Sequence, residues 1–131
     1  MSELDPAMVT AWLDAYKEAW ERQDGERIVD LFTETAQYVE TPFDPAMVGR
    51  EAIARYWHEG AVSAQRDISF DSTLWAIAGN VAFAHWKAEF TRVPTGEHRR
   101  LDGVFCLTFE ATADGLPRCE RLEEWWHADE T

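Results

Sequence analysis

The sequence predicts a single α+β domain over residues 1–131, with helices packed on one face of a curved sheet. Apolar residues recur at helical spacing in the first half, and four long strand-like runs follow Val62. Short turns separate those runs, and helices followed by strands are typical of an α+β arrangement. With 46% hydrophobic residues in 131 positions, the chain can bury one core of ordinary size.

The helical half is expected to begin at Asp5, a favourable N-cap, and Pro6 suits the first helical position. Asp24-Gly25 is predicted to end this first helix, because glycine favours the backbone conformation that closes a helix. A short second helix should follow over the apolar residues Ile28, Val29, Leu31 and Phe32. The apolar face of the first helix consists of Val9, Trp12, Leu13, Tyr16, Ala19 and Trp20.

Residues 36–40 alternate as in a strand, and Pro42 and Pro45 should end it, because proline cannot donate to a β-ladder. Gly49 then precedes a third helix, which carries Ile53, Tyr56 and Trp57 on one side. The long runs cover residues 67–78, 80–92, 100–110 and 117–127, with turns at 78–80, 94–96 and 113–115. Runs joined so closely should pair antiparallel.

The net charge of −13 is spread over both halves of the chain. Nucleic acids and anionic membranes select clustered Lys and Arg, so we expect neither as a partner. The N-terminal residues lack the basic and apolar segments of a signal peptide, so the expected location is the cytoplasm. No Gly-rich phosphate loop and no metal-ligand spacing of histidines is present, so we expect no cofactor and no metal.

The order of elements carries a resemblance, and the pieces are Gln23-Asp24-Gly25, residues 31–36, residues 48–53, residues 101–104, Phe109 with Asp114-Gly115, and residues 123–127. In these pieces the chain resembles the SnoaL-like branch of the nuclear transport factor 2-like superfamily. The resemblance implies a cone-shaped domain, with a curved mixed sheet wrapped around N-terminal helices. It also implies a deep pocket and a homodimer through the outer sheet face. The family includes enzymes and plain binding modules, so the fold alone does not give the function.

Two residues match positions that the isomerases of this superfamily use. Tyr16 resembles their hydrogen-bond donor to a developing oxyanion, and the alternative is a tyrosine that only packs in the core. Glu40 resembles their carboxylate base, and the alternative is a carboxylate in solvent at a strand end.

Two further residues are candidates to assist this chemistry. Asp102 matches an acidic position of catalytic members when aligned from the start of its strand. Aligned backwards from Phe109, that position becomes Phe105, and strand alternation puts Asp102 on the face opposite Phe105. His85 is a candidate general base, although a lone histidine in a strand is usually structural.

Seven tryptophans are the strongest compositional signal. Trp12 and Trp75 are expected to pack in the core. Trp125 and Trp126 are adjacent, so one should face inward and the other outward, where it would favour a dimer. The residues expected to line an apolar pocket are Trp20, Tyr38, Tyr56, Trp57 and Trp86.

These residues leave three hypotheses open. The first is a cofactor-free isomerase, cyclase, hydratase or hydrolase acting on a small apolar substrate. The second is a non-catalytic module that binds a small apolar or aromatic molecule, and the third is a dimeric interaction domain. Cys106 and Cys119 are expected to be reduced thiols, although one hairpin register would place them opposite each other.

Overall fold

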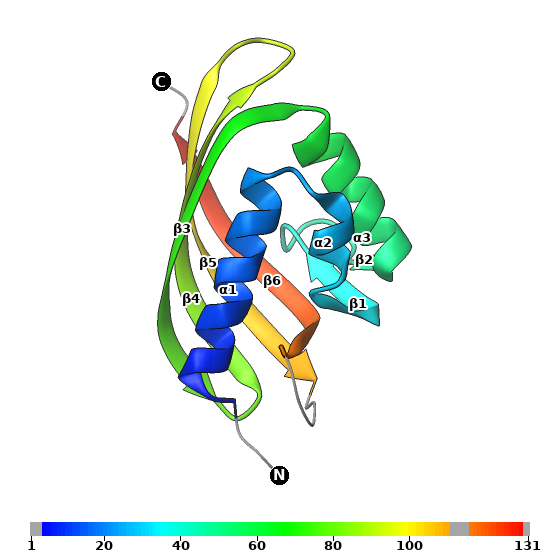
Figure 1. The fold of residues 1–131 in the computed structure, drawn as a ribbon, viewed down its shortest axis with the longest axis vertical. Helices are drawn as coiled ribbons and strands as arrows, with labels where there is room; N and C mark the ends of the chain where they lie inside the picture. The colour runs from blue at the N-terminus through cyan, green and yellow to red at the C-terminus, as the bar shows by residue number, and fades with distance from the viewer. Residues whose placement is uncertain (1–3, 111–115, 130–131) are drawn as a thin grey trace.

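A computed structural model describes residues 4–110 and 116–129, and its α+β architecture confirms the predicted fold class. The chain forms two helices, two strands, two further helical segments and then four long strands (Figure 1). The helical segments are α1 (Pro6–Glu21), α2 (Gly25–Val29), α3 (Arg50–Trp57) and a short π-helical turn, η1 (His58–Val62). The strands are β1 (Phe32–Val39), β2 (Met47–Val48), β3 (Gln65–Ala78), β4 (Val81–Arg92), β5 (His98–Glu110) and β6 (Arg118–Asp129).

The strands form one mixed sheet in the order β2-β1-β6-β5-β4-β3. The four long strands pair antiparallel in sequence order, as their short connections predict. β1 pairs parallel with β6, so a strand from the first third of the chain lies beside the last strand. The predicted turn at 113–115 lies outside the described residues.

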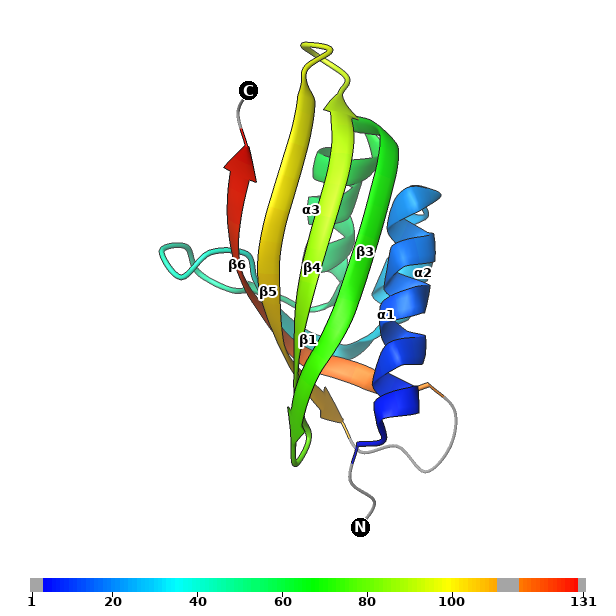
Figure 2. The ribbon, with the colours of Figure 1, turned by 90° about the vertical axis from the view of Figure 1, so that its left-hand side faces the viewer.

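The two faces of the sheet have different environments. The helices cover one face, here called the inner face, and the opposite outer face is seen in Figure 2 without a helix in front of it. Side chains of β4 alternate between them, with Trp86 buried on the inner face and His85 on the outer face. The inner face of β5 carries Phe105, Leu107 and Phe109, as the sequence pattern predicted.

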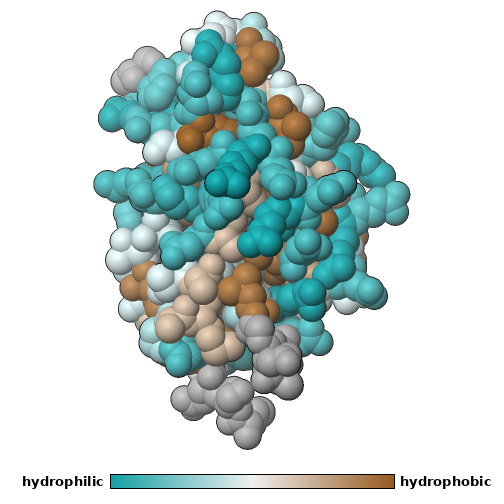
Figure 3. Space-filling view, viewed as in Figure 1, coloured by the Kyte–Doolittle hydropathy of each residue, from teal (hydrophilic) through white to brown (hydrophobic). Residues whose placement is uncertain are grey.

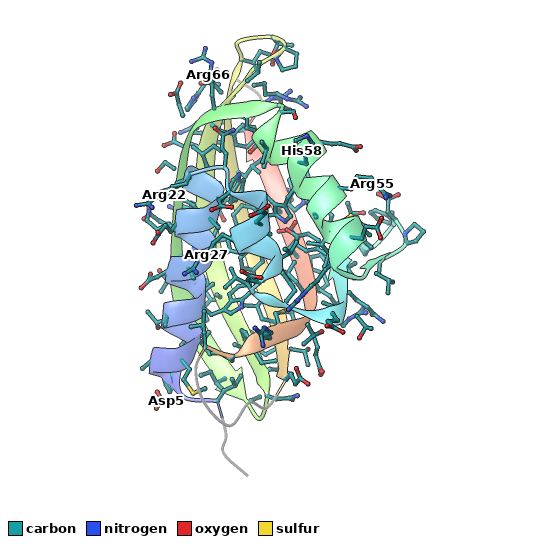
Figure 4. All side chains as sticks on the ribbon, turned by 45° about the vertical axis from the view of Figure 1, so that its right-hand side comes forward. Asp5, Arg22, Arg27, Arg55, His58 and Arg66 are labelled. Carbon is teal, nitrogen blue, oxygen red and sulfur yellow. The ribbon has the colours of Figure 1, made fainter. Side chains whose placement is uncertain are left out.

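Helix α1 begins as predicted, because the Asp5 side chain caps it at the backbone N–H of Ala7, at 2.8 Å (Figure 4). Its predicted end at Asp24-Gly25 is wrong. Gln23 instead adopts a positive φ of 56°, and its side-chain amide donates to the backbone carbonyl groups of Ala61, Val62 and Gln65. These tertiary hydrogen bonds hold a non-glycine residue in a conformation that glycine usually takes. Asp24 and Gly25 start α2 instead.

The first strand is longer than predicted. Phe32, which was predicted to belong to the second helix, is the first residue of β1. Its pairing with Cys119 of β6 explains the difference, since this partner lies 87 residues away and leaves no local signal. The short strand β2 was not predicted either, and it pairs with the end of β1.

The described helices include none long and apolar enough to cross a membrane. The surface in Figure 3 is mainly hydrophilic, with hydrophobic side chains in scattered spots.

Candidate functional site

A cavity of about 500 Å³ lies between the inner face of the sheet and the helical segments α1, α3 and η1. This volume is in the usual range for small-molecule sites. The predicted pocket residues Trp20, Tyr38, Tyr56, Trp57 and Trp86 all line it, together with the candidate catalytic residues Tyr16 and Glu40. Chain segments from both halves of the sequence therefore build one pocket.

Aromatic rings form the wall of this cavity. The ring of Trp57 lies edge-on to Trp20 and Tyr16, with centroids 5.3 and 5.5 Å away. The indole of Trp86 lies flat over the sheet, stacked on Phe105 at 5.3 Å. Gly103 on β5 makes room for this ring, since a Cβ there would approach Trp86 to 2.7 Å. The absence of a side chain at Gly103 thus lets the indole pack against β5, where it forms part of the cavity wall.

Three tyrosines come together beside this wall. The hydroxyl groups of Tyr16 and Tyr38 share a hydrogen bond of 3.1 Å in a fully buried position. The ring of Tyr56 contacts Tyr38 with centroids 5.2 Å apart. Burial raises the pKa of all three hydroxyl groups, and the nearby charge of Glu124 raises it further. These hydroxyl groups therefore stay protonated and can donate hydrogen bonds.

Glu124 on β6 is the most unusual polar residue of the cavity. Its side chain is only 6% exposed, and its carboxyl group forms no hydrogen bond or ion pair with the residues that the structure describes. Burial raises the pKa of this carboxyl group well above its ordinary range, and the charge of Glu40 adds to the effect. The result is a carboxyl group whose protonated form is favoured inside an aromatic cavity.

Glu40 lies directly after β1 and lines the same cavity at intermediate exposure. The indole N–H of Trp126 donates to its backbone carbonyl oxygen at 3.3 Å, which ties β6 to this position. Glu40 is therefore neither deep in the core nor free in solvent. The cavity holds two carboxyl groups in different environments, one buried and one nearer the surface.

The structure does not bring His85 and Asp102 to this cavity. Both lie on the outer face of the sheet, where the His85 Nε2 and Asp102 Oδ1 atoms are 2.7 Å apart. The Asp102 side chain is 57% exposed, and Phe105 takes the inner-face position of this strand, as its alternation indicated. No bulge interrupts β5 beside β4, so the sequence register carries through.

The prediction that Trp75 packs in the core is wrong, whereas Trp12 is fully buried as predicted. Trp75 is 59% exposed on the outer face and stacks on His85, with ring centroids 5.3 Å apart. Trp75 follows Leu74, which packs against the core, so strand alternation places Trp75 on the outer face. Of the adjacent pair, Trp126 lines the cavity, and Trp125 lies on the outer face, 49% exposed.

Both cysteines are free and do not face each other. Cys119 pairs with Phe109, and Cys106 pairs with Glu123. The possible hairpin register that would join them is therefore not the one adopted.

Sequence reasoning missed Glu124 as a site residue. The available signal was strand alternation, because Leu122, Glu124 and Trp126 must share one face of β6. A glutamate between two apolar residues of the inward face is a candidate for a buried acid. Sequence reasoning also missed Arg92 and Arg99 as residues that line the cavity.

Within residues 4–110 and 116–129, no three side chains of the His, Cys, Asp and Glu types gather as a metal-binding group. The polar groups at the cavity are carboxyl, hydroxyl, amide, guanidinium and indole N–H groups.

Comparison with known proteins identifies the family. The model of the SnoaL-like domain family matches residues 12–116. The chain belongs to this family. It is thereby a member of the nuclear transport factor 2-like superfamily, as its sequence resemblance indicated. No curated protein matches the sequence of this SnoaL-like domain.

Solved structures share its fold at low identity. A protein described as a putative scytalone dehydratase from Novosphingobium aromaticivorans matches with a TM-score of 0.81 and 16% identity, over 95% of this chain and 86% of that one. The epoxide hydrolase/cyclase-like enzyme SalBIII, described for pyran ring formation in salinomycin, matches with a TM-score of 0.76 and 21% identity. The match covers 94% of this chain and 93% of SalBIII. A nuclear transport factor 2-like superfamily protein from Salmonella enterica matches with a TM-score of 0.73 and 13% identity, over 89% of this chain and 87% of that protein. These likenesses show the fold alone.

Proposed function

We propose that this SnoaL-like domain is a cofactor-independent enzyme that moves protons on a small apolar or aromatic substrate. The observation that carries the proposal is Glu124, a buried carboxyl group that shares the cavity with Glu40. Two carboxyl groups whose environments separate their proton affinities form a natural acid and base pair. Isomerisation, cyclisation, hydration and dehydration all use such a pair.

In this proposal Glu40 accepts a proton from a carbon next to a carbonyl group of the substrate. The electron pair of that C–H bond forms a C=C bond, and the π electron pair of the carbonyl group moves onto its oxygen, where charge develops. Tyr16 and Tyr38 share one hydrogen bond between them, which leaves one hydroxyl proton of the pair to donate to that oxygen. Glu124, which holds a proton, can complete the neutralisation of the oxygen.

The dehydratase and cyclase-like names of the structural neighbours support this reaction class for the shared fold. His85 and Asp102 have no part in the proposal, because they lie across the sheet from the cavity. The expectation that no cofactor is required stays a prediction, as do the cytoplasmic location and the absence of nucleic-acid partners.

Proton exchange on an enolisable ketone tests the proposal. We expect the protein in D2O to catalyse deuterium incorporation into 2-tetralone, an aromatic ketone, above the rate in buffer, as measured by mass spectrometry. The E40Q variant should lose this catalysis and E124Q should reduce it by about tenfold or more. The D102N variant, on the outer face, should behave as the wild type. Equal exchange with wild-type protein and with E40Q would contradict the proposal.

The aromatic wall favours one alternative, a module that binds an apolar ligand without changing it. The same experiment separates the two functions. Quenching of tryptophan fluorescence by 2-tetralone without any deuterium incorporation is the expected result for a binding module.

We also propose that the domain forms a homodimer through its outer sheet face. Trp75 and Trp125 are large, exposed and both on that face, and exposed aromatic side chains on a sheet favour a protein partner. Sedimentation velocity should show a dimer at micromolar concentration, and W125E should convert it to a monomer. F43E is the control, because Phe43 is 93% exposed in the loop between β1 and β2. A monomeric wild-type protein would contradict this proposal.

A further inference from the structure

The cavity carries acidic side chains at one end and arginines at the other. Glu124 lies opposite Phe105 in the sheet, whereas Arg99 lies six residues earlier on β5, roughly 20 Å away along an extended strand. Among the described residues that line the cavity, the basic side chains are Arg92 and Arg99. Besides Glu40 and Glu124, the acidic side chain that lines the cavity is Glu59 on η1. A ligand that fills the cavity would thus meet Glu40 and Glu124 at one end and the two guanidinium groups at the other, with Glu59 as a third lining carboxylate.

The two arginines are neighbours by strand pairing. Arg99 lies opposite Phe90 across β4 and β5, and Arg92 is two residues beyond Phe90 on the same inner face. The Arg99 side chain is only 18% exposed and lies 3.6 Å from the carboxylate of Glu97. Arg92 is exposed and makes no ion pair with any residue that the structure describes. One of the two guanidinium groups is therefore available to a ligand, and the other is largely withdrawn from water beside it.

The overall charge of the chain makes this pair of cations informative. A net charge of −13 disfavours the approach of an anion at long range. The wall between the two charged ends is apolar, formed by Trp86, Phe90 and Leu101. An anion would therefore gain at this rim, where it meets two guanidinium groups next to apolar surface.

We propose that the substrate is an elongated apolar or aromatic molecule that carries one oxyanion group, such as a carboxylate, bound by Arg92 and Arg99. The apolar body lies along the aromatic wall, and the reacting end reaches Glu124. The position of the reacting end rests on the proposed function, whereas the oxyanion site stands on the arginines alone. A planar guanidinium group binds a carboxylate through two parallel hydrogen bonds, which fixes the direction in which the molecule enters.

A matched pair of fluorescent probes tests the oxyanion site. 1-Anilinonaphthalene-8-sulfonate carries an oxyanion on an aromatic body, and N-phenyl-1-naphthylamine is the same body without the sulfonate. We expect the wild-type protein to bind the sulfonate about tenfold more tightly, by titration of probe fluorescence. R92Q and R99Q should each remove much of this preference and leave the affinity for the neutral probe unchanged.

R66Q is the matched control. Arg66 lies near the same end of the molecule and follows the cavity residue Gln65, but it pairs with Asp67 at 2.7 Å and does not line the cavity (Figure 4). Its removal should change neither affinity. Equal affinities of the two probes in the wild type would overturn the proposal, as would an equal loss of both probes in R92Q and R99Q. Binding of the neutral probe reports that the cavity of each variant is intact.

The failure of this proposal differs from a failure of the proposed function. Probe preference with no deuterium exchange on 2-tetralone would reject the acid and base chemistry and keep the oxyanion site. Deuterium exchange without probe preference would do the opposite. E124Q should keep the preference for the sulfonate, because Glu124 lies at the other end of the cavity.

Discussion

The two faces of the sheet carry similar side chains with different consequences. On the outer face, Asp102 is 57% exposed and hydrogen-bonded to His85, and Trp75 stacks on that histidine in contact with solvent. On the inner face, Glu124 is 6% exposed and its carboxyl group has no bonded partner among the described residues. A carboxylate in water with a partner is stable and unreactive, whereas a buried carboxyl group without one keeps its proton. Environment, and not residue type, separates the candidate site from the rest of the sheet.

The largest expected difference between the faces concerns tryptophan. Trp12 is fully buried, stacks on Tyr16 at 5.4 Å and donates its indole N–H to the Leu31 carbonyl oxygen at 3.0 Å. W12A should lower the free energy of unfolding by about 3–5 kcal/mol, since it leaves a large cavity. W75A, on the outer face, should change it by about 0.5 kcal/mol. Urea denaturation measures both, and similar losses would contradict the contrast.

The next effect tests the close packing of the inner face. A Cβ at Gly103 would lie 2.7 Å from Trp86 and 2.7 Å from the backbone oxygen of Trp125. G103A should therefore destabilise the fold by about 1–3 kcal/mol and push the indole of Trp86 toward the cavity. The midpoint temperature of thermal denaturation and the affinity for N-phenyl-1-naphthylamine should both fall.

G25A is the control for G103A, because a Cβ at Gly25 meets no atom within 4 Å. This substitution lies in the first turn of α2 and should leave probe binding unchanged. A neutral effect of G103A would mean that Trp86 does not lie flat on the sheet.

The sequence predicted the strongly periodic parts of this fold. The apolar face of α1 and the meander of long strands follow from local spacing, and the five residues predicted for the pocket wall line the cavity. The end of α1 and the place of Phe32 were predicted wrongly, because contacts of Gln23 and Phe32 with residues far along the chain decide the conformation there. Glu124 was missed because an acidic letter does not reveal burial, which depends on the helices packed against its strand.

The protonation of Glu124 gives a smaller effect of opposite sign. The pKa of this carboxyl group is higher in the folded than in the unfolded chain. The stability that the bound proton contributes is full below the ordinary carboxyl range and is lost as the pH rises through the raised value. E124Q keeps the shape without the charge, so it should raise the free energy of unfolding at pH 8 by about 1–3 kcal/mol.

The same E124Q substitution should have little effect at pH 4, where both states of the wild type hold the proton. Urea denaturation over this pH range measures the difference. A pH dependence of unfolding that is identical in E124Q and wild type would show that Glu124 is hydrated in solution.

The smallest expected effect belongs to the outer face. The His85–Asp102 pair is partly exposed, with side chains 24% and 57% accessible, so solvent screens its interaction. A double-mutant cycle of H85A and D102N should give a coupling of less than about 1 kcal/mol at protein concentrations where the chain is monomeric. If the proposed dimer covers this face, the coupling should grow with protein concentration, because a partner subunit would remove the water that screens the pair. A coupling energy well above about 1 kcal/mol at every protein concentration would contradict the contrast between the two faces. Asp102 would then depend on its partner His85 as strongly as a buried carboxylate does.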